Sequence, residues 1–256
     1  MQFRIQILAR SAQEVENVNP GATTSWLSVR LWLPAILSTT AGAVDVIGFL
    51  ALGGLFAAHI TGDLVIVAAH YTTGRFGHVG PILAVPVFIV VLGVIVLLFG
   101  GIESKDRSRR ALLVVHAALL SICLGFGLSF GPFSNSDSPM AVLVGMLAVA
   151  SMATQNAMVK LALVKAPSTA VMTTNTTQLI IDLATLARGG EASDDLAKVR
   201  QRARVTFLCV AGFVAGCVAG AMLELRFGIG ALALPVMLAV LAVALGEQKG
   251  RTYEQF

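Results

Sequence analysis

Residues 44–63 read VDVIGFLALGGLFAAHITGD, and this stretch decides how the rest of the chain is interpreted. It is apolar enough to enter a membrane, yet it carries Asp45, Asp63 and the polar run HITG directly before the second acid. Thr, Asp and Gly favour turns and helix caps over helix interiors. The run therefore predicts a broken helix, which hydrocarbon tolerates only where the freed backbone faces protein or water.

The composition of the whole chain is that of a membrane protein. Of its 256 residues, 56% are hydrophobic and 12% are charged, whereas soluble domains carry about 25% charged residues. Between Arg30 and Arg75 only Asp45 and Asp63 carry a formal charge. A spanning helix needs about 20 apolar residues, so we expect a protein that crosses the bilayer several times. This excludes an ordinary soluble enzyme, and the 18 Lys and Arg are too sparse for a nucleic-acid-binding face.

A second polar run, MTTNTTQ at 172–178, lies in the second half of the chain. Each run follows an apolar stretch that contains polar residues, Asp45 in the first half and Gln155-Asn156 in the second. Each run is in turn followed by two plainly apolar stretches, which is the pattern of an internal duplication. The eight apolar stretches are 33–52, 55–71, 81–101, 111–130, 140–159, 168–187, 205–223 and 228–246.

We therefore expect a single membrane domain at 31–256, preceded by a cytoplasmic arm at 1–30. Within this domain the first repeat covers about 31–131 and the second about 138–247. A polar segment at 188–204, between the sixth and seventh stretches, is interpreted as a surface helix.

Loop charge decides between two topologies, because cytoplasmic loops carry the excess of Lys and Arg. If all eight stretches cross the membrane, 11 of the 18 Lys and Arg lie inside. If the second and sixth stretches enter the membrane and return, 16 of the 18 lie inside. The second count favours an all-α protein of six transmembrane helices plus two re-entrant or broken helices, arranged as two inverted repeats. Both termini are then cytoplasmic, and eight full spans remain the alternative.

These motifs resemble the YoaK-like family of bacterial membrane proteins over most of residues 33–246. The matching residues are Val44-Asp45-Val46 with HITGD at 59–63, and Gln155-Asn156-Ala157 with MTTN at 172–175. The family typically has Asn-Met-Thr-Gly-Asn at the first motif and Met-Thr-Gly-Asn at the second, so His59, Asp63 and Thr174 are departures. The resemblance implies a multi-pass protein of the bacterial inner (plasma) membrane whose domain has no established function, substrate or cofactor.

Ionisable residues within membrane spans are costly and are functional candidates by default. The apolar interior contains Asp45 and Asp63 but no Lys or Arg away from its ends, which favours a cation or a proton-coupled neutral solute over an anion. Helix capping is an equally strong interpretation of Asp63 and Asn175. The predicted substrate-binding residues are Asp45, Thr61, Gly62, Asp63, Gln155, Asn156, Thr173 and Asn175.

Two further groups of residues carry separate predictions. His70 and Asp182 each lie seven residues after a motif residue, so they form either a proton-relay pair or two groups near the membrane interface. Gly212, Gly216 and Gly220 share one helix face and predict close packing of another helix, from the same chain or from a second copy. The sequence shows no metal-ligand spacing, no cofactor fingerprint and no ATP-binding loop.

The leading hypothesis is a secondary transporter or channel-like permease for a small cation, or for a neutral metabolite with proton coupling, with its site at the midplane between two inverted repeats. An intramembrane enzyme acting on a lipid or quinone is the alternative, but the even division of polar residues between the repeats argues against an enzyme. A non-transporting membrane assembly subunit is the third reading. The expected partners are the lipid bilayer and a small-molecule or ion substrate, with no nucleic acid, no cofactor and no metal; a homo-oligomer is left open.

Overall fold

The computed structural model describes residues 20–73, 78–164, 166–189 and 193–246. These residues form helices joined by loops, with no β-strand among them. The helices are α2 (Pro20–Ala51), α3 (Ile60–Thr72), α4 (Val79–Phe99), α5 (Lys105–Phe130), α6 (Pro139–Ala162), α7 (Met172–Arg188), α8 (Ser193–Phe227) and α9 (Ala233–Gly246), with the 3₁₀ helix η1 (Gly228–Leu232) between the last two.

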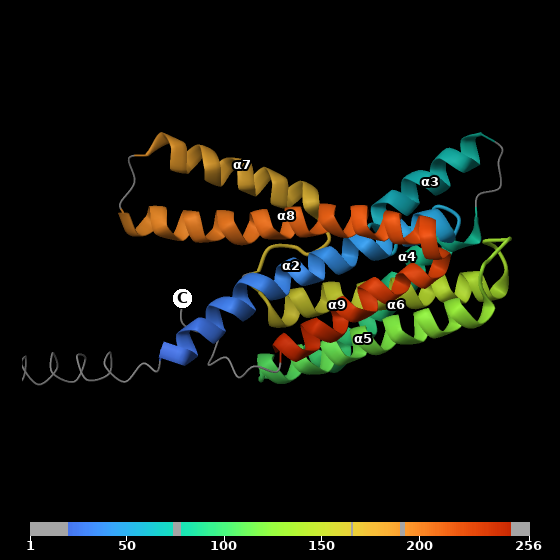
Figure 1. Ribbon diagram of the computed structural model, residues 1–256, viewed down its shortest axis with the longest axis horizontal. Helices are drawn as coiled ribbons and strands as arrows, with labels where there is room; N and C mark the ends of the chain where they lie inside the picture. The colour runs from blue at the N-terminus through green and yellow to red at the C-terminus, as the bar shows by residue number, and fades with distance from the viewer. Residues whose placement is uncertain (1–19, 74–77, 165, 190–192, 247–256) are drawn as a thin grey trace, which may run out of the picture.

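Five helical stretches of the described chain are long and apolar enough to cross a membrane, judged by length and composition. The last of them, Asp195–Gly246, contains η1, and Figure 1 shows the chain reversing there so that α9 runs back along the bundle. The predicted all-helical, multi-pass class is therefore confirmed at this level. Helices α3 and α7 have only 13 and 17 residues, fewer than the roughly 20 that a spanning helix needs.

The path of the chain places α3 and α7 along one side of a bundle of longer helices (Figure 1). After α2 has run through the bundle, the chain turns back toward the middle, where α3 begins and runs outward. After α6 the chain turns back from the other end, and α7 then runs outward in the opposite direction. The two short helices thus begin close to each other and diverge.

Two glycines end α2 and reverse the chain. Gly53 and Gly54 have φ of +70° and +80°, left-handed values that glycine adopts without the steric cost of a side chain. The N–H of Gly54 donates to the carbonyl of Phe49 at 3.0 Å, which closes the last turn of the helix. The five residues Leu55 to His59 that follow are not helical, so α3 begins later than the apolar stretch 55–71 suggested.

The glycine face of α8 packs against α2 of the same chain. A Cβ added at Gly216 would lie 2.1 Å from the carbonyl oxygen of Thr39, and one at Gly212 would lie 2.8 Å from that of Ala35. On the other side of the contact, a Cβ at Gly42 would lie 2.3 Å from the carbonyl oxygen of Phe213. Only glycine lets the two backbones approach this closely. Gly220 continues the face, against Val46 and Ala43.

Two boundaries differ from the sequence prediction. Helix α2 begins at Pro20, inside the segment 1–30 that was expected as an arm; residues 1–19 lie outside the described part of the chain. Helix α8 joins most of the polar segment 188–204 to the seventh apolar stretch in one continuous helix of 35 residues. A change from polar to apolar composition does not interrupt backbone hydrogen bonding, which explains why the composition suggested a boundary that the helix ignores.

Candidate functional site

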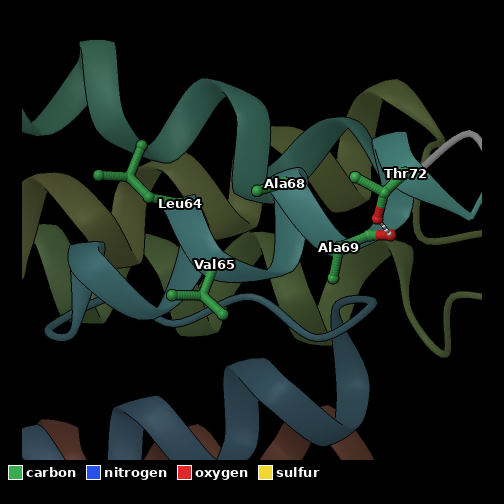
Figure 2. A pocket seen from close by; sticks show the side chains of 5 residues that line it. All are labelled: Leu64, Val65, Ala68, Ala69 and Thr72. Atoms are coloured by element: carbon green, nitrogen blue, oxygen red, sulfur yellow. Dashed lines mark hydrogen bonds between the residues drawn. The ribbon is translucent and has the colours of Figure 1, made fainter.

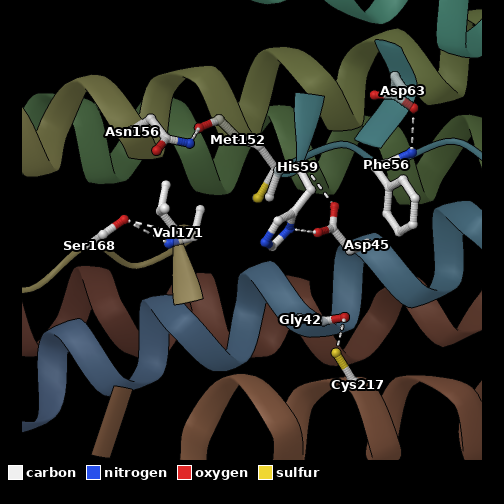
Figure 3. Close-up of polar contacts among 12 residues, drawn as sticks. Gly42, Asp45, Phe56, His59, Asp63, Met152, Asn156, Ser168, Val171 and Cys217 are labelled. Atoms are coloured by element: carbon white, nitrogen blue, oxygen red, sulfur yellow. Dashed lines mark hydrogen bonds and ion pairs between the residues drawn. The ribbon is translucent and has the colours of Figure 1, made fainter. Parts of the chain in front are cut away.

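Asp45 holds the end of the segment that returns after α2 (Figure 3). Its side chain is buried, and its Oδ1 accepts a hydrogen bond from the N–H of Ala58 at 2.7 Å. Its Oδ2 pairs with Nδ1 of His59, the residue directly before α3. Both carboxylate oxygens are therefore used to fix the start of α3 in the interior.

Asp63 makes a similar contact from the first turn of α3. Its Oδ1 accepts a hydrogen bond from the N–H of Phe56 at 3.0 Å (Figure 3). Its Oδ2 is buried and has no hydrogen-bond partner. Leaving a buried polar atom unpaired is costly, so this oxygen needs an explanation that the protein's own contacts do not supply.

The second half places amides where the first half has carboxylates. Gln155, buried on α6, donates through Nε2 to the carbonyl of Leu37 at 3.0 Å and to Oγ1 of Thr169 at 2.9 Å. Its Oε1 is buried without a partner. Asn175, in the first turn of α7, donates through Nδ2 to the carbonyl of Ser168 at 2.6 Å. Asn156 instead donates to Met152 within α6 (Figure 3).

Contacts of the two halves recur at matching separations along the chain. In each half, a polar residue of the long helix contacts a residue 14 positions further on, in the returning segment. In each half, a residue in the first turn of the short helix contacts the backbone seven positions earlier. The pairs are Asp45–His59 and Gln155–Thr169, then Asp63–Phe56 and Asn175–Ser168.

The capping interpretation of Asp63 and Asn175 can be compared with this geometry. Helices α5 and α6 begin at true side-chain caps, Ser104 and Ser138, whose hydroxyls accept from an N–H three residues further on. Helices α3 and α7 have no side-chain cap. Asp63 and Asn175 bind the returning segments in place of capping their own helices, so the backbone N–H groups at the start of α3 and α7 gain no side-chain acceptor from the cap position.

Aromatic rings surround His59 next to its carboxylate partner. The ring centroid of His59 lies 5.3 Å from that of Phe213 on α8 and 6.5 Å from that of Phe56. Close by, Ala57 and Ala58 before α3 and Ala170 before α7 belong to the same buried cluster. The two returning segments therefore share one core. His59 is half-buried beside this core, with aromatic rings on one side and the carboxylate of Asp45 on the other.

Other predicted site residues lie around this centre. Gly62 lies against Phe56, because an added Cβ would be 2.8 Å from that ring. Thr61 and Thr173 are exposed in the first turns of α3 and α7, and they take no part in the buried contacts described above. The structure thus brings Asp45, Asp63, Gln155 and Asn175 into the interior and leaves the two predicted hydroxyls on its surface.

His70 and Asp182 are not brought together. Asp182 is buried on α7 and accepts hydrogen bonds from Nη2 of Arg202 at 2.6 Å and from its Nε at 2.9 Å. Gln178 donates to the same carboxylate at 2.7 Å. His70 lies on α3, which diverges from α7 (Figure 1). The carboxylate of Asp182 therefore links α7 to α8. A proton relay would need a partner that exchanges protons, whereas the partner of Asp182 is a guanidinium, which stays protonated.

The sequence predicted the buried polar residues of the site but not the residues that they contact. It named His59 only as a departure from the family motif, and it gave no role to Thr169 or Ser168. In both halves a polar residue follows 14 positions after the polar residue of the long helix, and this spacing could have identified His59 and Thr169. His116 is a separate case: it is fully buried between α5 and α6, with Nδ1 2.7 Å from Oγ of Ser151. Among the described residues, no group of three His, Cys, Asp or Glu is arranged to hold a metal ion.

Comparison with known proteins places these contacts in a family. No curated protein and no solved structure matches the chain. A family model described as a protein of unknown function, DUF1275, matches residues 33–245. The matched range contains both polar motifs and every contact of the candidate site, and it confirms the YoaK-like resemblance. The chain therefore belongs to the DUF1275 family of proteins of unknown function.

Proposed function

We propose that this protein is a secondary transporter that moves a small cation, or a neutral solute together with a proton, across the bacterial inner membrane. The observation that carries the proposal is the pair of short helices, α3 and α7, which begin close to each other midway along the bundle, after segments that return from opposite ends and make matching contacts. Broken helices that begin near the midplane are the binding elements of many transporters.

The architecture we propose has six crossings and two re-entrant hairpins in two inverted repeats. Helices α2, α4, α5, α6, α8 and α9 would cross, and α3 and α7 would return to the side from which their segments entered. The opposite directions of α3 and α7 support this arrangement, as do their short lengths (Figure 1). The loop charge counts support cytoplasmic termini and a cytoplasmic start of α5.

The donors and acceptors of the candidate site support a ligand that is cationic or donates hydrogen bonds. The amide nitrogens of Gln155, Asn156 and Asn175 already donate to protein acceptors. Among the buried residues of the candidate site, the atoms left without partners are acceptors, Oδ2 of Asp63 and Oε1 of Gln155. A ligand that satisfies them must carry positive charge or donate hydrogen bonds. An anion would be repelled by the carboxylate of Asp63.

Asp63 is the residue we propose for proton coupling. A proton on its Oδ2 would remove the negative charge from a buried site that contains no Lys or Arg. A cationic ligand, or a ligand that donates a hydrogen bond, would compete with that proton for the same oxygen. Release of the proton to water when the ligand binds gives exchange, and its retention with a neutral solute gives cotransport.

The test is solute-dependent proton movement in proteoliposomes that contain purified protein and a trapped pH-sensitive dye. Small amines and neutral polyols are added one at a time under an imposed pH gradient. We expect the wild-type protein to change the internal pH with at least one solute. Asp63→Asn should lower that rate about tenfold or more, because a charge-assisted hydrogen bond contributes about 1.5–3 kcal/mol.

Asp195→Asn is the matched control, because Asp195 is an exposed acid paired with Lys198 on α8. It removes the same charge and should leave the rate unchanged. Proton movement that is absent with every solute, or that is equal in the Asp63→Asn protein, would contradict the proposal. The appearance of an altered lipid in the same vesicles would point to the enzyme alternative instead.

A further inference from the structure

The start of α5 carries an open groove with a charged end and an apolar end. The groove has a volume of about 730 Å³. Arg107 and Arg110 line it near the N-terminus of the helix, and both side chains are exposed. Further along the helix the wall is apolar, formed by Ala111, Val114 and Val115. Because residues three or four apart share one helix face, the charged end leads directly into the apolar end.

The charged end of the groove keeps two positive charges. Asp106 also lines the groove, but its carboxylate pairs with Nη1 of Arg109 at 2.9 Å. Arg109 is buried and donates through Nη2 to the carbonyl of Gly246 at 3.3 Å, so this pair belongs to the packing of α5. Arg107 and Arg110 form no ion pair with any residue that the structure describes. Like charges three residues apart repel each other, and an anion between them would remove that repulsion.

The groove is long enough to join the headgroup layer of a bilayer to its hydrocarbon. Helix α5 is among the stretches long and apolar enough to cross a membrane. From Arg107 to Val115 the helix rises about 12 Å, whereas the headgroup layer on each side of a bilayer is about 5–8 Å thick. With the arginines among the headgroups, the exposed Val114 and Val115 lie against lipid chains.

The groove on α3 shows what is special about the one on α5. It is open, has a volume of about 470 Å³, and is lined by Leu64, Val65, Ala68, Ala69 and Thr72. Figure 2 shows these side chains along one face of the helix, with the hydroxyl of Thr72 donating to the carbonyl of Ala69 at 3.0 Å. None of these lining residues is charged, so this groove fits acyl chains without selecting a headgroup.

We propose that the groove at the start of α5 binds an anionic phospholipid. Its phosphate lies between Arg107 and Arg110, whose planar guanidinium groups match phosphate oxygens, and one acyl chain follows the apolar wall. Water can hydrate both guanidinium groups, but it neither neutralises their charge nor covers the valines at low cost. A soluble phosphate would satisfy the charged end alone. This inference rests on the placement of the chain in a membrane and not on transport.

Native mass spectrometry of the full chain tests the site. The protein is released from nanodiscs that contain equal parts of phosphatidylglycerol and phosphatidylcholine with the same acyl chains. We expect the lipid that stays bound at the highest activation energy to be phosphatidylglycerol. Replacing both arginines, Arg107→Gln with Arg110→Gln, should lower its ratio to phosphatidylcholine about tenfold, because each basic residue near an anionic lipid contributes a factor of about five.

A second variant reaches the same end without removing an arginine. Ala111→Glu places a carboxylate four residues after Arg107, where it can pair with that guanidinium and repel a phosphate. It should also remove most of the preference for phosphatidylglycerol. A preference that survives in this variant and in the glutamine variant would overturn the proposal.

Arg200→Gln with Arg204→Gln is the matched control. These two exposed arginines of α8 line neither groove, and their replacement removes the same charge. The lipid ratio should stay as in the wild type. An equal loss in the control would overturn the proposal, because any exposed basic residue would then have the same effect. A wild-type protein without a preference would also overturn it, since water would then be the cover.

Glycerol phosphate distinguishes a lipid from a soluble anion. It is added to the wild-type protein in nanodiscs of equal phosphatidylglycerol and phosphatidylcholine, at millimolar concentration. We expect phosphatidylglycerol to stay bound, because the acyl chain adds contacts that the soluble ester lacks. Displacement of the lipid, with glycerol phosphate bound in its place, would show that the groove takes a soluble phosphate ester and would overturn the proposal.

Discussion

At the scale of single residues, Asp45 links a long helix to a segment that has left helical structure. The N–H of Ala58 has no helical acceptor, and the carboxylate supplies one at 2.7 Å while also pairing with His59. A backbone donor buried without an acceptor costs about 1–3 kcal/mol. Asp45 thus has a structural role in addition to any ligand contact, and substitutions can separate the two roles.

We expect Asp45→Ala to lower the thermal stability of the purified protein and Asp45→Asn to lower it less. The alanine leaves the N–H of Ala58 and the ring of His59 without their acceptor, whereas the asparagine oxygen still accepts from Ala58. The losses should be about 3 kcal/mol and about 1 kcal/mol respectively. Melting followed by intrinsic fluorescence measures the order of the three proteins. An Asp45→Ala protein as stable as the wild type would show that the contact contributes nothing.

At the scale of elements, the contact between α2 and α8 holds the bundle to which the short helices attach. It depends on glycines on both sides, Gly42 on α2 and Gly212 and Gly216 on α8. Helix α7 is attached to α8 by the pair Asp182–Arg202, and α3 lies on α4. A change in the packing of α2 against α8 would therefore move the start of both short helices relative to each other.

We expect Gly216→Ala to destabilise the protein, because the new Cβ would lie 2.1 Å from a backbone oxygen that cannot turn aside. Overpacking of this kind typically costs about 1–3 kcal/mol. Gly125→Ala on α5 is the matched control, since no atom lies within 4 Å of its added Cβ. It should be neutral or slightly stabilising, as alanine favours helix over glycine. Equal melting temperatures for the two variants would argue against the close α2–α8 contact.

At the scale of the whole molecule, the number of crossings follows from the side of the membrane on which each loop lies. With two re-entrant hairpins, the start of α5 is cytoplasmic and the loop between α5 and α6 is external. With eight full spans, both positions exchange sides. Lys105 and Asp137 are partly exposed residues at these two places, so one pair of sites distinguishes the topologies.

We expect Lys105→Cys to react with a membrane-impermeant maleimide only from the cytoplasmic side, and Asp137→Cys only from the external side. Intact cells and inverted vesicles give the two accessibilities directly. The reverse pattern would establish eight crossings, and the proposed midplane site between inverted repeats would then be wrong. Each variant serves as the control for the other, because a leaky preparation labels both from both sides.

The sequence by itself determined the features that depend on neighbouring residues. Apolar runs showed an all-helical membrane protein, and local polarity showed breaks at HITGD and MTTN, near which α3 and α7 begin. The family also follows from these contiguous motifs. Hydrophobicity is a local property of the chain, which is why the membrane class and the approximate positions of the helices could be predicted without a structure.

Only the tertiary structure decided which side chains meet. A helix such as α4, apolar on every side, does not encode how it is rotated against its neighbours, so pattern alone cannot orient it. The pairing of Asp45 with His59 and of Asp182 with Arg202 depends on chain reversals that bring distant backbone together. The exposure of Thr61 and Thr173 likewise depends on what packs over α3 and α7. Local composition identifies polar residues, but three-dimensional packing determines which of them are buried, paired or exposed.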